Sequence, residues 1–191
     1  MTAQSQAPDG GGDPAASPVA GRLQRTIALV GLMGVGKSTV GRKLAESLGA
    51  TFVDSDEEIE KAAGLSVQEI FERHGEPEFR RGERRVIERL LAGPPIVLAT
   101  GGGAYIDPAT RALMKEKATT VWLRADLDLI WKRVNRRDTR PLLKRENPKQ
   151  VLAELNEARA PIYAEADIVV DSGDFPASEA AKAIREKLGL V

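Results

Sequence analysis

The stretch GLMGVGKS at residues 31–38 decides the fold, because it fits the phosphate-binding pattern G-x-x-x-x-G-K-[ST]. The apolar segment Thr26–Val30 precedes it and an amphipathic segment follows it, so the loop is predicted to join a strand to a helix. Its glycines let the backbone turn tightly and aim N–H groups inward, and the helix N-terminus adds its dipole. The stretch therefore predicts a cradle for a polyphosphate; the alternative is a glycine-rich turn that holds no ligand.

Two side chains at the end of this loop have distinct predicted tasks. Lys37 is expected to reach the β- and γ-phosphates, and Ser38 is expected to offer its hydroxyl to Mg²⁺, a hard ion that needs few protein ligands. The sequence has neither the Asn-Lys-x-Asp segment of GTPases nor the Ser-Gly-Gly-Gln signature of transporter ATPases, which leaves a small-molecule kinase. The residues predicted to bind the nucleotide here are Gly34, Val35, Gly36, Lys37, Ser38 and Thr39.

On either side of the loop, short apolar runs alternate with longer amphipathic stretches, the pattern of strands joined by crossover helices. The pattern predicts an α/β fold of three layers, α/β/α, with a five-stranded parallel sheet covered on both faces. Helix starts are indicated by Ser66 with Glu69, Asp107, Asp126 and Asn147, and a helix end by His74 before Gly75. The predicted strands are Thr26–Val30, Thr51–Asp54, Ile96–Thr100, Thr119–Leu123 and Ile168–Asp171.

The composition excludes several classes of protein and of chemistry. The 191 residues carry 28 Lys and Arg against 28 Asp and Glu, so no net charge draws the chain to nucleic acid or to an anionic membrane. The absence of cysteine excludes disulfides, thiolate zinc sites and cysteine nucleophiles, and the single histidine argues against His-rich metal sites and most catalytic triads. The apolar stretches are too short for a bilayer and no secretory signal is recognised, which predicts a cytoplasmic protein. Residues 1–22 are predicted to be a disordered tail, and residues 23–191 a single domain.

Two carboxylates, Asp54 and Asp56, stand where the second predicted strand meets a loop. Ligands of open α/β sheets bind at this edge, and alternation along an extended backbone would point both side chains toward one side. One could hold a metal-bound water and the other an acceptor hydroxyl. The alternative for Asp56 is a purely structural role as the N-cap of a helix over Glu57–Ala63.

A run of three glycines, Gly101, Gly102 and Gly103, follows the third predicted strand. Three successive glycines permit both a positive φ and the close approach of a ligand ring to the backbone. The run therefore favours a ligand-binding wall over a flexible loop with no partner.

Six blocks of the sequence, taken together, resemble the shikimate kinase family in order and spacing. The resemblance covers about residues 26–171, and it implies the architecture of P-loop kinases of the nucleoside-monophosphate-kinase type. The blocks are the phosphate-binding stretch, Asp54-Ser55-Asp56, Glu78-Phe79-Arg80, Thr100-Gly101-Gly102-Gly103, Arg140-Pro141-Leu142-Leu143 and Arg159-Ala160-Pro161-Ile162-Tyr163.

The resemblance implies transfer of the γ-phosphoryl of Mg·ATP to the 3-hydroxyl of shikimate, a step of aromatic amino acid (chorismate) biosynthesis. Arg80 and Arg159 match the arginines that bind the carboxylate of shikimate, for which a planar guanidinium is well shaped. Asp56 matches the residue that holds the ring hydroxyls, and the three glycines match the wall of that pocket. Asp54 matches a carboxylate near the magnesium. Without the resemblance, Arg80 would be read as one of many arginines on a solvated helix face.

The basic segment from Lys132 to Arg145 matches the end of a helix and a mobile lid, here about residues 135–147. The resemblance implies that Arg140 reaches the transferring phosphoryl group, and that Arg133 and Pro141 flank the adenine. The implied catalytic residues are thus Lys37, Asp56 and Arg140. Near Gly173–Pro176 the chain lacks an arginine that relatives can carry beside the adenine, and Phe175 is expected to pack there instead.

Two alternatives remain from the sequence. The first is a kinase of another polyol acid such as gluconate, which would share the phosphate cradle but not the acceptor blocks. The second is a nucleotide-sensing or nucleic-acid-binding module that uses the basic segment, although that segment lacks aromatic residues for base stacking. The expected partners are ATP and shikimate, with Mg²⁺ as cofactor, no nucleic acid, no membrane and a monomeric chain.

Overall fold

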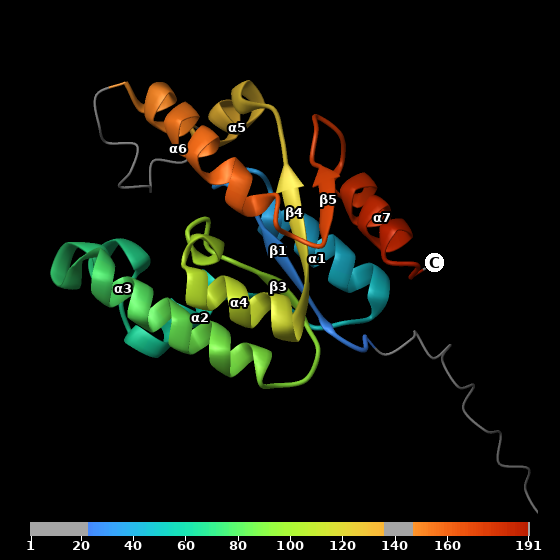
Figure 1. Cartoon of the computed structure of the whole chain (residues 1–191), viewed down its shortest axis with the longest axis horizontal. Helices are drawn as coiled ribbons and strands as arrows, with labels where there is room; N and C mark the ends of the chain where they lie inside the picture. The colour runs from blue at the N-terminus through green and yellow to red at the C-terminus, as the bar shows by residue number, and fades with distance from the viewer. Residues whose placement is uncertain (1–22, 136–146, 191) are drawn as a thin grey trace, which may run out of the picture.

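The computed structural model describes residues 23–135 and 147–190. Its centre is a sheet of five strands, all parallel, in the order β2-β3-β1-β4-β5 (Figure 1). The five-stranded parallel sheet of the sequence prediction is thereby confirmed. In chain order the elements are β1 (Thr26–Val30), α1 (Lys37–Leu48), β2 (Phe52–Asp54), α2 (Ser55–Ala63), α3 (Val67–Leu91), β3 (Val97–Ala99), the 3-10 helix η1 (Ala104–Ile106), α4 (Pro108–Lys117), β4 (Ala118–Arg124), α5 (Leu127–Val134), α6 (Pro148–Tyr163), β5 (Ile168–Asp171) and α7 (Ala177–Lys187).

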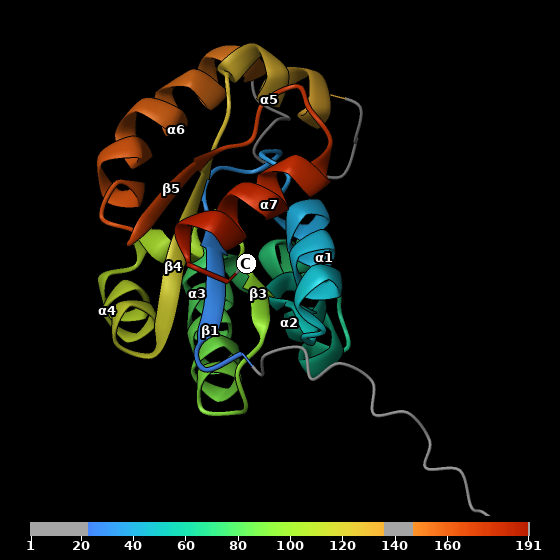
Figure 2. The same ribbon diagram turned by 90° about the vertical axis from the view of Figure 1, so that its right-hand side faces the viewer.

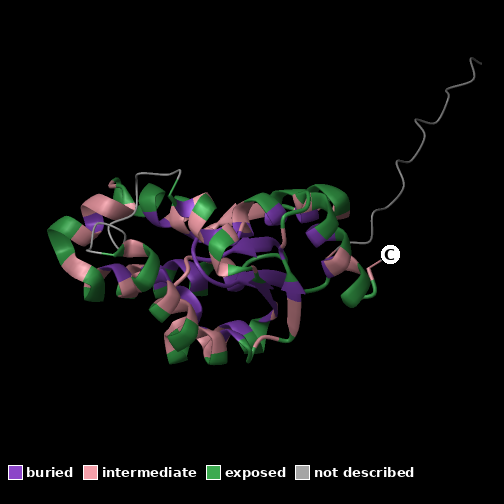
Figure 3. Cartoon of the chain, turned by 90° about the horizontal axis from the view of Figure 1, so that it is seen from above, coloured by how far each residue is buried: buried purple, intermediate pink, exposed green. Residues whose placement is uncertain are grey.

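The sheet separates two hydrophobic clusters, because side chains alternate along each strand. Ile27 and Leu29 of β1 belong to the cluster that includes residues of α1 and α7. Ala28 and Val30 belong to the other, which includes residues of α3, α4, α5 and α6. Figure 2 shows α1 and α7 side by side, and Figure 3 shows the buried strands between helices whose outer faces are exposed. The three-layer α/β/α arrangement is thus confirmed.

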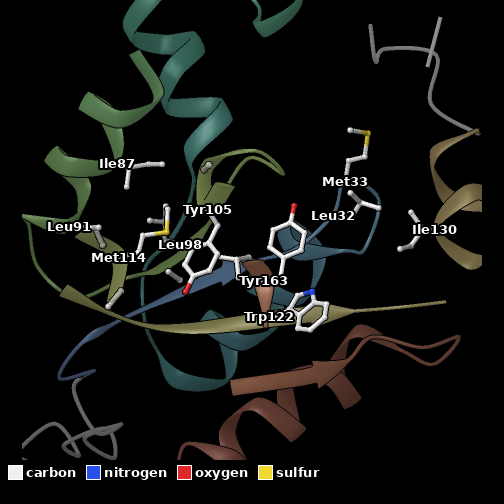
Figure 4. Packing of buried hydrophobic residues seen from close by; sticks show 14 of the residues in the cluster. Leu32, Met33, Ile87, Leu91, Leu98, Tyr105, Met114, Trp122, Ile130 and Tyr163 are labelled. Carbon is white, nitrogen blue, oxygen red and sulfur yellow. The ribbon is translucent and has the colours of Figure 1, made fainter. Parts of the chain in front are cut away.

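Aromatic and aliphatic side chains fill the larger cluster beneath the site (Figure 4). The rings of Trp122 on β4 and Tyr163 on α6 have centroids 6.0 Å apart. Ile130 of α5 and Leu32 of the loop after β1 belong to the same cluster. The core therefore reaches up to the loop that the sequence marks as phosphate-binding.

The predicted strand bounds differ from the observed ones by one residue at most. The segments Thr26–Val30 and Ile168–Asp171 form strands with the predicted bounds. The third strand ends at Ala99, and Thr100 instead donates its hydroxyl to the carbonyl of Leu29 at 2.9 Å. None of the helices in the two described ranges combines the length and the apolar character needed to cross a membrane.

The capping signals mark helix starts as predicted. Ser66 and Glu69 form a complete capping box at α3, and the side chains of Asp107 and Asp126 accept amide hydrogen bonds at α4 and α5. Asn147 begins α6 with φ 53°, so the start is correct although no side-chain cap bond joins it to another described residue. Gly75, with φ 78°, interrupts the long helix α3 directly after His74, where a helix end was expected.

Candidate active site

A cavity of about 440 Å³ opens where β1, β2 and β3 end. Ligands of open parallel sheets bind at this edge, because several loops leave the strands there. The cavity joins the phosphate-binding loop, the two aspartates and the glycine run. The predicted site residues that line it are Gly34, Gly36, Lys37, Ser38, Thr39, Asp54, Asp56, Gly101, Gly102 and Arg133.

The phosphate-binding loop has the backbone that its glycines require. Gly34 has φ 79° and lies against α5 so closely that a methyl group there would be 2.3 Å from Cγ2 of Val134. Gly36 has φ 103°, and α1 begins directly after it. The buried Lys37 extends back over the loop and donates from Nζ to the carbonyls of Gly31 at 2.7 Å and Leu32 at 3.0 Å.

Ser38 and Asp54 form a pair of oxygen donors at the side of the cavity. The hydroxyl of Ser38 donates to Oδ2 of Asp54 at 2.6 Å. The other oxygen of Asp54 accepts from the amide of Asp56 at 3.0 Å and so caps α2. A hydroxyl and a carboxylate are hard ligands that suit Mg²⁺, which keeps most of its waters when bound to protein. The two residues therefore fit the predicted metal site.

The structural alternative for Asp56 is wrong, because Asp54 is the residue that caps α2, and the helix begins at Ser55. Both carboxylates do point to one side, but strand alternation, the reason given for that expectation, is wrong. Asp56 lies in the first helical turn rather than on an extended strand. Both carboxylates line the cavity because the strand ends and the helix begins at this point.

The glycine run is pressed against charged side chains from two helices, α2 and α3. A methyl group on Gly101 would lie 2.7 Å from Oε1 of Glu83 and 2.8 Å from Oδ1 of Asp56. A methyl group on Gly103 would lie 2.3 Å from Nη2 of Arg80. All three distances are shorter than real Cβ contacts, so a side chain at either position would force the facing carboxylate or guanidinium to move.

The carbonyl of Gly102 accepts hydrogen bonds from α6. Arg159 donates from Nη1 at 3.2 Å, and the hydroxyl of Tyr163 donates to the same oxygen. Burial raises the pKa of Tyr163, while the charges of Arg159 and Arg80 act in the opposite direction. Both guanidinium groups therefore lie near this hydroxyl, and the two predicted carboxylate-binding arginines converge on the glycine run.

Arg80 is held by carboxylates rather than free on a solvated helix face. Its Nη1 donates to Oε2 of Glu83 at 2.6 Å, and its Nη2 lies 3.3 Å from Glu76. Burial opposes the charge of Arg80, but Glu83 and Glu76 outweigh it and raise the pKa of Arg80. Burial also raises the pKa of Glu83, which Arg80 opposes and Asp56 reinforces. The site thus contains a pair of opposite charges beside the acceptor wall, in which Glu83 is buried and Arg80 is half-buried.

At the other end of the cavity, Arg133 joins two loops. Its guanidinium donates to the carbonyls of Val35 at 3.2 Å and Gly173 at 3.0 Å. Phe175 lines the cavity with 43% of its surface exposed, and its ring covers Gly173. Arg140, Pro141, most of the predicted lid and the predicted tail lie outside the described residues.

Three polar residues at the site were not predicted from the sequence. They are Glu83, which pairs with Arg80, Tyr163, which bonds to Gly102, and Ser172, which bonds to Val35. The first two had weak signals, because Glu83 is three residues from Arg80 on a helix and Tyr163 ends a family block. Ser172 had none, since its partner is 137 residues away in the chain.

Comparison with known proteins identifies the family. A family model described as shikimate kinase matches residues 33–189. A shikimate kinase of Paramagnetospirillum magneticum is 61% identical over 156 residues, which are 82% of this chain and 80% of that protein. A structure of shikimate kinase from Acinetobacter baumannii in complex with shikimate has a TM-score of 0.83 at 41% identity, and the match covers 86% of this chain and 93% of that one.

A gluconokinase from Sinorhizobium meliloti is also similar, with a TM-score of 0.56 and 20% identity over 88% of this chain and 97% of that one. At that identity the likeness concerns the fold alone. The sequence matches, in contrast, are with shikimate kinases and extend over most of the chain. The chain therefore belongs to the shikimate kinase family and is a kinase.

Proposed function

We propose that this protein transfers the γ-phosphoryl group of Mg·ATP to the 3-hydroxyl of shikimate, giving shikimate 3-phosphate and ADP. The observation that carries the proposal is the glycine run. On one side Arg80 and Arg159 converge on Gly102 and Gly103, and on the other Asp56 lies against Gly101 in the cavity that also contains Lys37. The cavity thus offers an acceptor for hydroxyls and a cradle for phosphates, and the cations for a carboxylate lie beside it, against Gly102 and Gly103.

The acceptor half of this pocket suits the chemistry of shikimate, a ring with one carboxylate and three hydroxyls. Two guanidinium groups bind a carboxylate with directional, charge-assisted hydrogen bonds. Asp56 then faces the hydroxyl end of the ring. The ring itself lies against Gly101 and Gly102, which line the cavity.

On the nucleotide half, the loop amides and Lys37 bind the β- and γ-phosphates, and Ser38 with Asp54 holds Mg²⁺. When bound, Mg²⁺ neutralises negative charge on the phosphate oxygens. Arg133 and Phe175 flank the base, with Pro141 from the predicted lid.

Asp56 orients the 3-hydroxyl toward the γ-phosphorus and accepts its proton as the new P–O bond forms and the bond from the γ-phosphorus to the bridging oxygen of ADP breaks. Because phosphoryl transfer has a loose transition state, the hydroxyl need not be deprotonated early, and orientation is the larger part of this role. Lys37 and Arg140 stabilise charge on the transferring group. Closure of the predicted lid excludes water, which would otherwise compete as the acceptor.

The test is ADP release measured in parallel with shikimate, gluconate, AMP and no acceptor. We expect release that depends on shikimate alone. Gluconate-dependent release would replace the proposal by the polyol acid alternative. Equal release in all wells would mean that the cavity hydrolyses ATP without an acceptor.

The remaining properties follow from this reaction. The substrates are small molecules, so neither nucleic acid nor a membrane is needed. One domain over residues 23–191 contains every proposed site residue, which is consistent with a monomer. The use of ATP is consistent with a cytoplasmic location.

A further inference from the structure

Ser172 lies directly after β5, outside the residues assigned above to substrates or metal. Its side chain is buried, with 4% of the residue exposed, and its amide donates to the carbonyl of Arg124 at 2.6 Å. The backbone of Ser172 is thereby fixed to the end of β4. Its hydroxyl reaches across to the phosphate-binding loop and donates to the carbonyl of Val35 at 2.8 Å.

The carbonyl of Val35 accepts a second side-chain hydrogen bond, from Arg133 at 3.2 Å. The two donors come from different elements, since Arg133 lies on α5 and Ser172 follows β5. The side chain of Val35 is 1% exposed in the hydrophobic core. Both the side chain and the carbonyl of this residue are therefore held in place.

A held carbonyl fixes the next amide, because the peptide bond is planar and its C=O and N–H point in opposite directions. The next amide belongs to Gly36, which lines the cavity between Gly34 and Lys37. Gly36 has φ 103°, so this peptide has a conformation that glycine alone adopts readily. A glycine-rich loop has many other conformations available to it, and an external bond reduces their number.

We infer that Ser172 is a positioning residue for the nucleotide: by holding the Val35 carbonyl outward, its hydroxyl directs the Gly36 amide toward the phosphates. Ser172 lines the cavity, but in this role it acts on the phosphates through one peptide group rather than by direct contact. The β5–α7 connection thus sets the shape of a loop that is 137 residues away in sequence.

The test uses Ser172→Ala and a pair of nearly isosteric variants, Ser172→Thr and Ser172→Val, which differ in the hydroxyl. Mg·ADP binding is measured by calorimetry with no acceptor present, and KM is measured for each substrate. Because binding is read without an acceptor, the result does not depend on shikimate being the substrate. Thr120→Val is the matched control. Thr120 also has a buried hydroxyl, which donates to Asp167 at 2.7 Å, but it lies near the start of β4 and does not line the cavity.

Loss of one hydrogen bond to a carbonyl is expected to weaken Mg·ADP binding about three- to tenfold in Ser172→Ala and Ser172→Val. Ser172→Thr is expected to bind as the parent does. KM for ATP should rise in parallel while KM for shikimate stays within twofold, and Thr120→Val should lose thermal stability with no change in Mg·ADP affinity. Equal Mg·ADP affinities of Ser172→Thr and Ser172→Val would overturn the inference, and so would an equal rise in KM for ATP and for shikimate. The comparison of these two variants remains decisive even if Ser172→Ala does not fold.

Discussion

Gly103→Ala tests the acceptor wall, because it adds one methyl group at a known place. The backbone at Gly103 has φ −102° and ψ −12°, a conformation that alanine adopts without strain. The new Cβ would lie 2.3 Å from Nη2, 2.6 Å from Cζ and 2.7 Å from Nη1 of Arg80. Ordinary contact begins near 3.4 Å, so the guanidinium must move by about 1 Å.

The guanidinium is the flexible end of a long side chain, so we expect it to move while the fold persists. Its charge-assisted hydrogen bonds to the carboxylate of shikimate would be lost or misaligned, at a cost of about 1.5–3 kcal/mol. That free energy corresponds to a rise of about 10- to 100-fold in KM for shikimate. KM for ATP is expected to stay within twofold, because no phosphate-binding residue lies against the new methyl group.

Steady-state kinetics with each substrate varied in turn, together with thermal unfolding, measure these effects. Gly82→Ala is the matched control: it lies on α3 near Arg80, and a methyl group there meets nothing within 4 Å. It should leave both KM values unchanged and stabilise the helix by about 0.5–1 kcal/mol. If Gly103→Ala kept KM for shikimate within twofold of the parent, Arg80 would not bind the acceptor as proposed.

Three further variants test other parts of the site. Asp56→Asn should lower kcat by about 10²- to 10⁴-fold, and turnover within a few-fold of the parent would exclude the proposed role. Phe175→Ala should raise KM for ATP about fivefold to tenfold with no effect on shikimate; an unchanged value would mean that the ring does not contact the base. Because burial raises the pKa of Glu83, the folded protein binds its proton more tightly than the unfolded chain, and this group makes stability fall as pH rises above 4.5. Denaturation of Glu83→Gln across that range should show a shallower fall, and parallel curves would contradict the assignment.

The sequence predicted the framework well, because the fold depends on local patterns. Parallel strands buried on both faces give short apolar runs, and Thr26–Val30 and Ile168–Asp171 have the predicted bounds. Helix starts such as Asp107 were found from a capping residue followed by proline. The predicted bounds of β3 were one residue too wide at each end, and Thr100 there donates both its amide and its hydroxyl to the carbonyl of Leu29 on the neighbouring strand.

Most residues of the site were predicted from the sequence, but the contacts that hold them in place were not. Asp56 was found from its place after a predicted strand and Arg80 through a family block, yet only the three-residue spacing from Arg80 hinted that Glu83 lies buried beside both. Glu83 looks like one of several acids on an amphipathic helix until the helix is placed against Gly101. Such contacts depend on packing between elements, which local patterns do not encode.

Because Lys37 is bonded to its own loop, its contribution to nucleotide affinity is the free energy of its bonds to the phosphates minus that of the bonds to the loop that it gives up. The ammonium group is already solvated by the oxygens of Gly31 and Leu32, so an arriving polyphosphate must compete with them for the same protons. Departure of the product restores this internal solvation and lowers the free-energy cost of letting it go. The loop carbonyls thus lower the affinity of the site for ADP, which favours product release and repeated turnover.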